Sequence, residues 1–174
     1  MKKRRLNKRA LKAIVRLYLI FGACLLVFVV AFQIDAVHNA IVKPFTSVVA
    51  VVSQFIMNLF GAGASVNNCV LSTPNYSVNV VDGCNGIYAT AILISGVLAY
   101  PRRWSQKVWG IILGVVAVFI LNLGRVISLF YLGQYHPDIF DEVHVYAWQP
   151  LIIIWAIFVW DYWARKTEPA ATID

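Results

Sequence analysis

The chain has 174 residues, of which 60% are hydrophobic and only 13% are charged. A soluble domain is about half apolar and a quarter charged, so this composition excludes an ordinary soluble protein and indicates an integral membrane protein. The net charge of +7 is concentrated beside apolar segments, which favours contact with anionic lipid over nucleic-acid binding.

The apolar segments predict an all-α polytopic membrane protein with about four transmembrane helices in a single domain, residues 1–174. A span needs ~20 mainly apolar residues, and one shorter segment qualifies because it carries no charge. The apolar run after the basic N-terminus is longer than the core of a signal peptide, so we expect an uncleaved first span. The predicted parts are a basic cytoplasmic tail at 1–12 and spans at 13–34, 84–100, 108–131 and 147–163.

Lysine and arginine mark the cytoplasmic side of a membrane protein. Eight of the fifteen lie in residues 1–16, three lie in 101–107 and two lie at 165–166. All three regions are therefore expected inside, with both termini cytoplasmic. Because the first span then ends outside and the span that leads to 101–107 begins outside, residues 35–83 begin and end on the outer side.

Residues 41–60 are apolar enough to suggest a fifth span, but their polar side chains fall on one helical face. Such a helix is more typical of the outer membrane interface, or of a polar stripe packed on a protein interior, than of a crossing in lipid. The next segment, 65–82, holds the turn signal Thr73-Pro74-Asn75 and an alternating pattern, which predict a short hairpin outside the membrane. The polar residues of the helix are Lys43, Thr46, Ser47, Ser53, Gln54 and Asn58.

This topology brings a thiol, a guanidinium and an imidazole to one membrane level. Cys84 opens the second span. Arg125 lies ~26 Å along its predicted helix at 1.5 Å per residue, and a lipid-facing arginine there costs about 3 kcal/mol, so it must face protein or water. His144 lies just before the last span, whose first turn holds Pro150.

These three groups match the needs of acyl transfer. The Cys84 thiolate is a nucleophile, and the imidazole of His144 can take its proton and later protonate the leaving amine. The guanidinium of Arg125 can hold the oxyanion of a tetrahedral intermediate and lower the thiol pKa. The glycines beside Cys84 let a substrate backbone approach closely. The sequence therefore predicts an acyl-transferring cysteine enzyme, with no metal or cofactor expected.

Each residue also has a plainer interpretation. Cys84 is either a packing residue at a helix start or a disulfide partner of Cys69, since both face an oxidising compartment; taken alone, it fits these readings better than catalysis. An intramembrane charge is by default functional, so Arg125 is the strongest single signal, although acidic residues in the following loop offer it ion pairs. His136 competes with His144, whereas His38 is farther off and Cys24 is a core residue. The acidic residues are Asp138, Asp141 and Glu142.

The motifs Cys84-Asn85-Gly86, Asn122-Leu123-Gly124-Arg125 and His144 stand in this order at successive outer span ends. They resemble the Cys, Arg and His motifs of the exosortase/archaeosortase family, over Gly83 to about Trp163. The compact chain is most similar to the small exosortase H type, although family members often carry serine where this chain has Asn85. The resemblance implies that Cys84, Arg125 and His144 are catalytic and that Asn85, Gly86 and Asn122 support them.

The resemblance further implies a membrane cysteine peptidase and transpeptidase of the bacterial inner membrane, with its site and hairpin on the periplasmic side. Its substrates would be secreted proteins with a C-terminal sorting signal made of a short motif, a hydrophobic helix and a basic end. The motif implied for the small type is similar to Ile-Pro-Thr-Leu followed by Trp-Gly. Cys84 would form a thioacyl-enzyme, from which an unknown acceptor nucleophile releases the protein. The implied partners are these tailed proteins, the acceptor and the lipid bilayer, with no nucleic acid.

Two other function classes stay open at this point. The chain is alternatively a non-catalytic membrane subunit of a transport or assembly complex, in which Arg125 is structural or lines an ion path. A third hypothesis is a thiol redox protein that uses Cys69 and Cys84, which the lack of a CxxC pair weakens.

Overall fold

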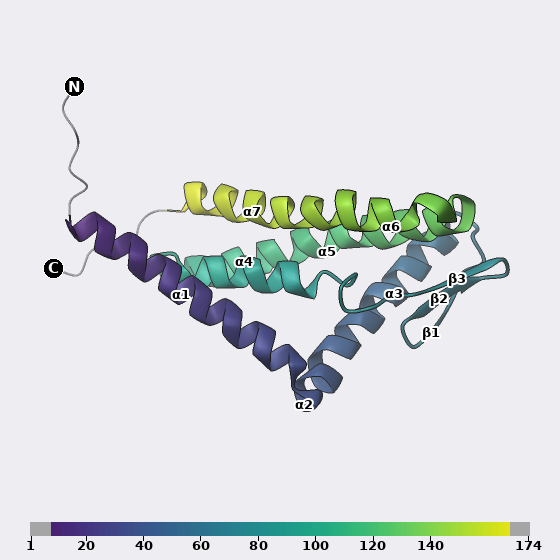
Figure 1. Cartoon of the computed structure of the whole chain (residues 1–174), viewed down its shortest axis with the longest axis horizontal. Coiled ribbons are helices and arrows are strands. Elements are labelled where there is room, and N and C mark those ends of the chain that lie inside the picture. The colour runs from purple at the N-terminus through teal and green to yellow at the C-terminus, as the bar shows by residue number, and fades with distance from the viewer. Residues whose placement is uncertain (1–7, 168–174) are drawn as a thin grey trace, which may run out of the picture.

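A computed structural model describes residues 8–167, most of which are helical. Three of the long helices run roughly side by side along the long axis, and a small sheet lies at the end of the molecule far from the first helix (Figure 1). The prediction of an all-α polytopic protein with a minor hairpin is confirmed. The long helices are α1 (Lys8–Gln33), α3 (Lys43–Leu59), α4 (Ile87–Ala99), α5 (Trp104–Tyr135) and α7 (Gln149–Lys166). Most of the predicted tail, residues 1–7, lies outside the described part.

Short helical turns extend two of these helices into longer rods. Asp35–Leu59 is helical throughout, and so is Pro137–Lys166. The sequence analysis placed His144 in a loop before the last span, which is wrong: His144 lies inside the second rod, because the backbone stays in the right-handed helical region from Phe140 onward. The short turns are α2 (Asp35–Val37), η1 (His38–Val42), η2 (Pro137–Ile139), α6 (Phe140–Glu142) and η3 (Val143–Trp148).

The sheet has three antiparallel strands in the order β1-β2-β3. The predicted hairpin corresponds to β2 (Val70–Thr73) and β3 (Tyr76–Asn79), and β1 (Ser65–Asn67) is a strand that the sequence analysis did not expect. Leu71 is opposite Val66 on one side and Val78 on the other, so one face of the sheet is apolar. This face packs on α3 and α5.

Two apolar clusters divide the interior. The first joins α3, the sheet and the far half of α5, with Val49, Leu71 and Phe130 fully buried. The second joins α4, the near half of α5 and α7, and contains Leu93 and Trp163. The segment from Val80 to Gly86 runs between the two clusters, and this position decides where Cys84 lies.

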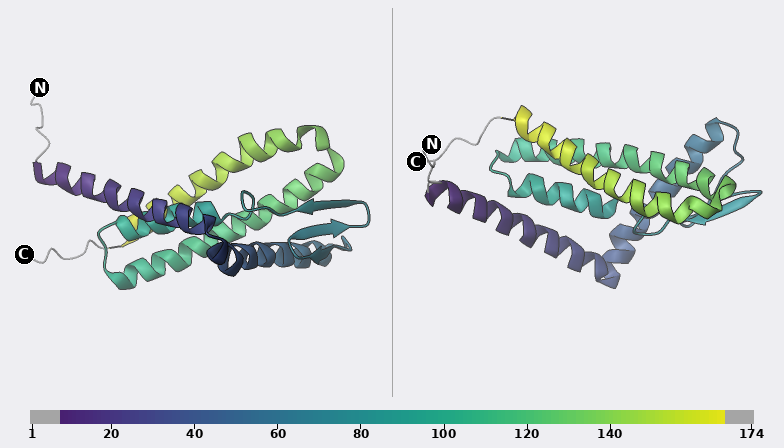
Figure 2. Two further views of the ribbon diagram at one scale, coloured as in Figure 1. Left: turned by 60° about the horizontal axis from the view of Figure 1, so that its bottom comes forward. Right: turned by 45° about the horizontal axis from the view of Figure 1, so that its top comes forward.

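The rods that are long and apolar enough to cross a bilayer differ from the predicted set in one member. They are Leu11–Gln33, Asp35–Leu59, Trp104–Tyr135 and Pro137–Lys166, whereas Ile87–Ala99 is shorter. Even so, α4 packs among α1, α5 and α7, while α3 continues beyond the end of α1 toward the sheet in both further views (Figure 2). This arrangement agrees with the prediction that the short α4 lies inside the membrane and that α3 lies outside the part of the membrane that α1 crosses.

The middle of the predicted polar stripe of α3 faces the protein interior, whereas Lys43 and Asn58 at its ends are exposed. Thr46 and Ser53 are buried, and the side-chain amides of Gln54 and Asn58 both donate to the carbonyl of Ala64. The opposite face of α3 is exposed and apolar, which suits contact with the outer leaflet. Its residues are Val48, Val51, Phe55 and Leu59.

The arrangement predicts that the sheet lies outside the membrane. In a chain whose native cysteines are replaced by serine, Asn75→Cys should react with a membrane-impermeant maleimide on spheroplasts. Ser105→Cys, at the start of α5, is the control and should react only after lysis. Both positions are exposed. Protection of position 75 together with labelling of position 105 would reverse the orientation of the whole site.

Candidate active site

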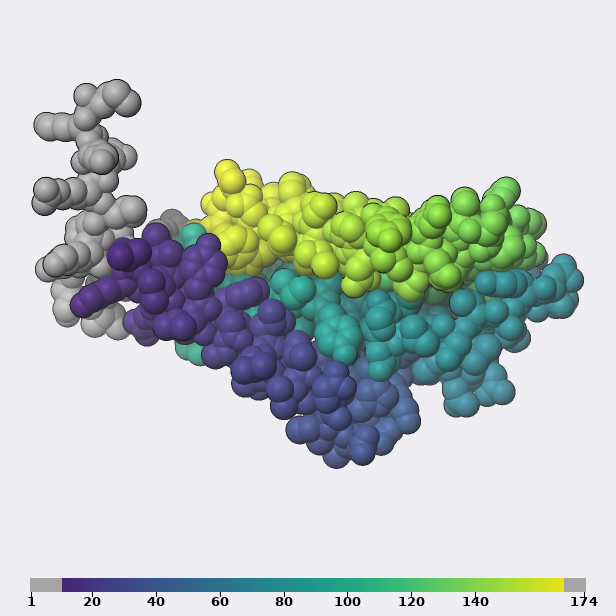
Figure 3. Space-filling model, viewed as in Figure 1, coloured from purple at the N-terminus to yellow at the C-terminus, as the bar shows by residue number. Residues whose placement is uncertain are grey.

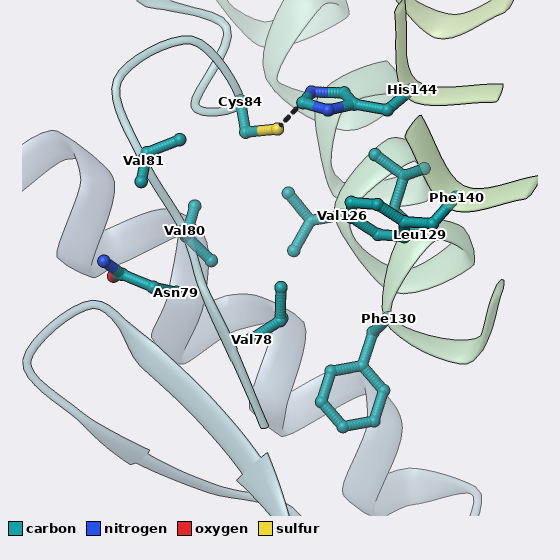
Figure 4. A pocket seen from close by; sticks show the side chains of 10 residues that line it. All are labelled: Val78, Asn79, Val80, Val81, Cys84, Val126, Leu129, Phe130, Phe140 and His144. Atoms are coloured by element: carbon teal, nitrogen blue, oxygen red, sulfur yellow. Dashed lines mark hydrogen bonds between the residues drawn. The ribbon is translucent and has the colours of Figure 1, made fainter. Parts of the chain in front are cut away.

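Cys84 lies in a tight turn between the sheet and α4. Its backbone N–H donates to the carbonyl of Val81 at 2.8 Å, and α4 begins three residues later at Ile87. The thiol is therefore outside the helix, close to its N-terminal end. Figure 4 shows the sulfur pointing across a cavity toward the last rod.

Asn85 ties this turn to α3. Its side chain is fully buried, and its Oδ1 accepts a hydrogen bond from the backbone N–H of Ile87 at 2.9 Å. Its Nδ2 donates to Oγ1 of Thr46 at 2.8 Å, and the Thr46 hydroxyl donates to the carbonyl of Val42. A serine at position 85 is too short to span the same gap in this way, which gives a structural reason for the asparagine.

Gly86 has a backbone conformation that favours glycine. Its φ is +80°, and a Cβ added there would lie 3.0 Å from Cγ of Asn122. Asn122 is fully buried against this glycine, and neither atom of its amide has a hydrogen-bond partner within residues 8–167. Asn85, Gly86 and Asn122 thus fix the position of the Cys84 turn from three sides.

His144 faces Cys84 directly. Its Nε2 lies 2.7 Å from the Cys84 Sγ, within hydrogen-bonding reach. The ring also packs on Phe140, with centroids 5.8 Å apart, and this contact restrains the imidazole. Of the two histidines that competed in the sequence analysis, the other, His136, is exposed where α5 ends.

Arg125 is 1% exposed, although it lies in the middle of an apolar helix. Its Nη2 donates to Oε1 of Gln149 at 3.0 Å, and its guanidinium is close enough to Cys84 for its charge to act on the thiol. Across residues 8–167 no carboxylate lies within ion-pair distance of it. The expected alternative, pairing with the acidic residues of 138–142, is therefore not seen.

A π-helical turn brings the partners of Cys84 and Arg125 to one side of the last rod. His144 and Gln149 are five residues apart, which on an α-helix would turn them ~140° away from each other. The intervening segment, Val143–Trp148, is π-helical, and its i→i+5 hydrogen bonds make residues five apart neighbours. The sequence analysis missed both Gln149 and this turn, and no pattern in the sequence indicates the turn.

The other candidates lie apart from this group. Cys24, Cys69 and Cys84 are all free thiols, so the expected alternative of a Cys69–Cys84 disulfide is not seen. His38 is 2.7 Å from Oδ2 of Asp82, and this pair ties η1 to the turn that holds Cys84. The pair was also missed, because 44 residues separate its members in the sequence.

The environment of Cys84 has opposing effects on its ionisation. Burial raises the pKa of the Cys84 thiol above its ordinary value, whereas the nearby charge of Arg125 lowers it. A thiol that gives its proton to a neighbouring imidazole needs such a cation, because the cation stabilises the thiolate in an apolar setting. The three side chains together can generate a nucleophile, transfer its proton and bind a developing oxyanion.

Removing the charge of Arg125 should therefore raise the pKa of Cys84 further. In a chain with Cys24→Ser and Cys69→Ser, Arg125→Gln should slow alkylation of Cys84 by iodoacetamide, measured below the ordinary thiol pKa of about 8.5. The thiolate fraction falls as the pKa rises, so the pH profile moves to higher pH. The control is Arg102→Gln, because Arg102 bonds Thr167 and Ala164 on the other side of the molecule. Equal profiles for the two variants would show that Arg125 does not act on the thiol.

Comparison with known proteins agrees with the family that the sequence motifs resemble. The family model for transmembrane exosortase (Exosortase_EpsH) matches residues 12–160. A probable archaeosortase E of Methanocaldococcus jannaschii is 25% identical over 113 residues, covering 65% of this chain and 59% of the relative. The match thus spans about three fifths of that relative's length, and no solved structure matches. Because the family model covers most of the chain, including all three site segments, the chain belongs to the transmembrane exosortase family.

Proposed function

We propose that the chain is a membrane cysteine transpeptidase that cleaves the C-terminal sorting signal of secreted proteins and transfers them to an acceptor nucleophile. The observation that carries the proposal is the 2.7 Å contact between Cys84 Sγ and His144 Nε2, with the charge of the buried Arg125 acting on the same thiol. A non-catalytic membrane subunit has no need of a thiol–imidazole pair. Membership of a sorting family gives the class of substrate.

The first half of the reaction forms a thioester. His144 takes the proton of the Cys84 thiol, and the thiolate attacks the carbonyl carbon of the scissile peptide bond. The negative charge moves to the carbonyl oxygen, where the guanidinium of Arg125 stabilises it. When the intermediate collapses, the C–N bond breaks and His144 gives its proton to the leaving amine.

The second half releases the protein. The acceptor nucleophile loses its proton to His144 and attacks the thioester carbonyl, and Arg125 again stabilises the oxyanion. The attack forms the new acyl bond, and collapse of the intermediate then breaks the C–S bond, restores the C=O and returns the proton from His144 to the Cys84 sulfur. Asn85, Gly86 and Asn122 hold the turn that carries Cys84 in place, so that the thiol moves little. The substrate is then a tailed secreted protein, and the site faces the periplasm from the inner membrane.

The direct test is processing of a tailed reporter. A secreted reporter ending in Ile-Pro-Thr-Leu-Trp-Gly, an apolar helix and a basic end should lose its tail when the enzyme is present, as shown by its mass. Cys84→Ser should abolish the loss of the tail, because an alcohol is not ionised by this imidazole. Cys69→Ser is the matched control, a second free thiol on the same side, and should process normally. Full processing by Cys84→Ser would contradict the proposed nucleophile.

The two outer histidines provide a second test. His144→Ala should lower the processing rate ~100-fold or more, in the range that general acid–base groups contribute, since no other imidazole is hydrogen-bonded to the thiol in residues 8–167. His136→Ala removes an exposed side chain and should leave most of the rate. Membrane abundance is compared by immunoblot. The opposite ranking at equal abundance would show that His144 is not the acid–base group.

A further inference from the structure

An apolar groove leads from the sheet to the Cys84 sulfur. It encloses a cavity of about 140 Å³ whose far end is formed by Cys84 and His144. Figure 4 shows one wall as the chain from Val78 to Val81 and the other side as helices α5 and α6. Figure 3 shows that the sheet and the last rod meet on the surface at this end of the molecule. The lining between the two ends is apolar and comprises Val78, Val80, Val126, Leu129, Phe130 and Phe140.

The strand that lines one wall of the cavity, β3, also has an unpaired edge. β3 is an outer strand, and β2 is its one strand neighbour in the part of the chain that the structure describes. The N–H of Val80 donates to the carbonyl of Cys69 at 2.8 Å, in the same register that places Val70 opposite Asn79. Hydrogen-bonded pairs alternate along an antiparallel ladder. The N–H and C=O groups of Ser77 and Asn79 therefore point away from β2, toward the open edge.

We propose that the substrate segment just before the cleaved bond binds as an added strand along the open edge of β3, parallel to it, with its last carbonyl at Cys84. This proposal rests on the proposed function and names the binding mode of that same site. An extended peptide recognises a strand edge through its backbone, and shallow apolar contacts select uncharged side chains. The open edge of β3 supplies the backbone groups. The groove beside it supplies the apolar contacts and ends at the reacting sulfur.

The direction of the added strand follows from the shape of the molecule. β3 runs from Tyr76 toward Cys84, and the sheet and α4 lie at opposite ends of the segment that joins them (Figure 1). A tailed substrate has its folded domain outside the membrane and its apolar helix inside. The segment before the cleaved bond therefore comes from the sheet end, so its chain runs in the same direction as β3. The segment after the bond continues toward α4.

The test removes one outward-facing amide at a time. Asn79→Pro deletes an N–H on the open edge and keeps the bonds to β2, and it should lower the rate of reporter processing at least about fivefold, as expected for a lost backbone hydrogen bond. The matched control is Val66→Pro. Val66 is opposite Leu71 on β1, and by the same alternation its N–H points to the other outer edge of the sheet. Alkylation of Cys84 and the melting temperature should be unchanged in Asn79→Pro, which separates substrate binding from damage to the fold.

A second measurement leaves the enzyme intact. Synthetic peptides with the reporter motif are N-methylated at single residues before the cleaved bond. Cleavage should fall with two-residue periodicity, because alternate amides of an added strand face β3. The proline of the motif has no N–H, so methylation of the isoleucine and threonine on either side of it should slow cleavage, and methylation of the leucine should not.

The outcomes separate the two proposals. If the unmodified enzyme leaves the reporter intact, the proposed function is wrong and the binding mode falls with it. Suppose that the enzyme processes the reporter but that Asn79→Pro processes it as fast as Val66→Pro does, or that cleavage of the methylated peptides shows no two-residue periodicity. In either case only the binding mode is wrong. If Asn79→Pro instead turns a dimer into a monomer at unchanged processing, the edge pairs with a second copy of the chain and the proposal is overturned.

Discussion

The burial of one guanidinium constrains the rest of this structure. Arg125 is 1% exposed in the interior of an apolar helix, where an unsatisfied cation is too costly to tolerate. Its Nη2 donates to Oε1 of Gln149 and its charge acts on the nearby Cys84 thiol, so α5, α7 and the turn before α4 meet at one level. The geometry of the candidate site is therefore also the way in which this buried cation is solvated. A substrate oxyanion would complete the set of partners that the guanidinium lacks.

The site lies where two separately packed regions meet. One region is the sheet with α3, and the other is the helix group α4, α5 and α7. The turn that holds Cys84 is fixed to the first by the bond from Asn85 to Thr46 and by the His38–Asp82 pair. Gly86 against Asn122 fixes it to α5. A thiol held from both sides meets the imidazole with little freedom to move, and this preorganisation is what acyl transfer requires.

Much of the candidate site could be predicted because membrane topology restricts the depth at which each residue lies across the bilayer. The distribution of lysine and arginine sets which span ends lie outside, and Cys84, Arg125 and His144 all fall at such ends. The same reasoning separated Arg125 from the lipid-facing residues around it. It favoured His144 over His136 because His144 stands just before the last predicted span. In the structure the His144 ring lies at the thiol, and His136 is exposed at the end of α5.

The sequence by itself determined that the chain is a polytopic membrane protein, because the apolar content and charge placement are properties of composition along the chain. It also predicted the three chemical groups of the candidate site, because the topology places each of them at an outer span end. Only the tertiary structure decided the pairing of Arg125 with Gln149, the π-helical turn that sets His144 and Gln149 on one side, and the open edge of β3 beside the thiol. These features depend on helix phase and on contacts between segments distant in sequence. Hydrophobic periodicity and composition do not determine helix phase or long-range contacts. A shift of one residue in helix phase changes which side chain faces a neighbouring segment, but it leaves the hydrophobic pattern of the sequence the same.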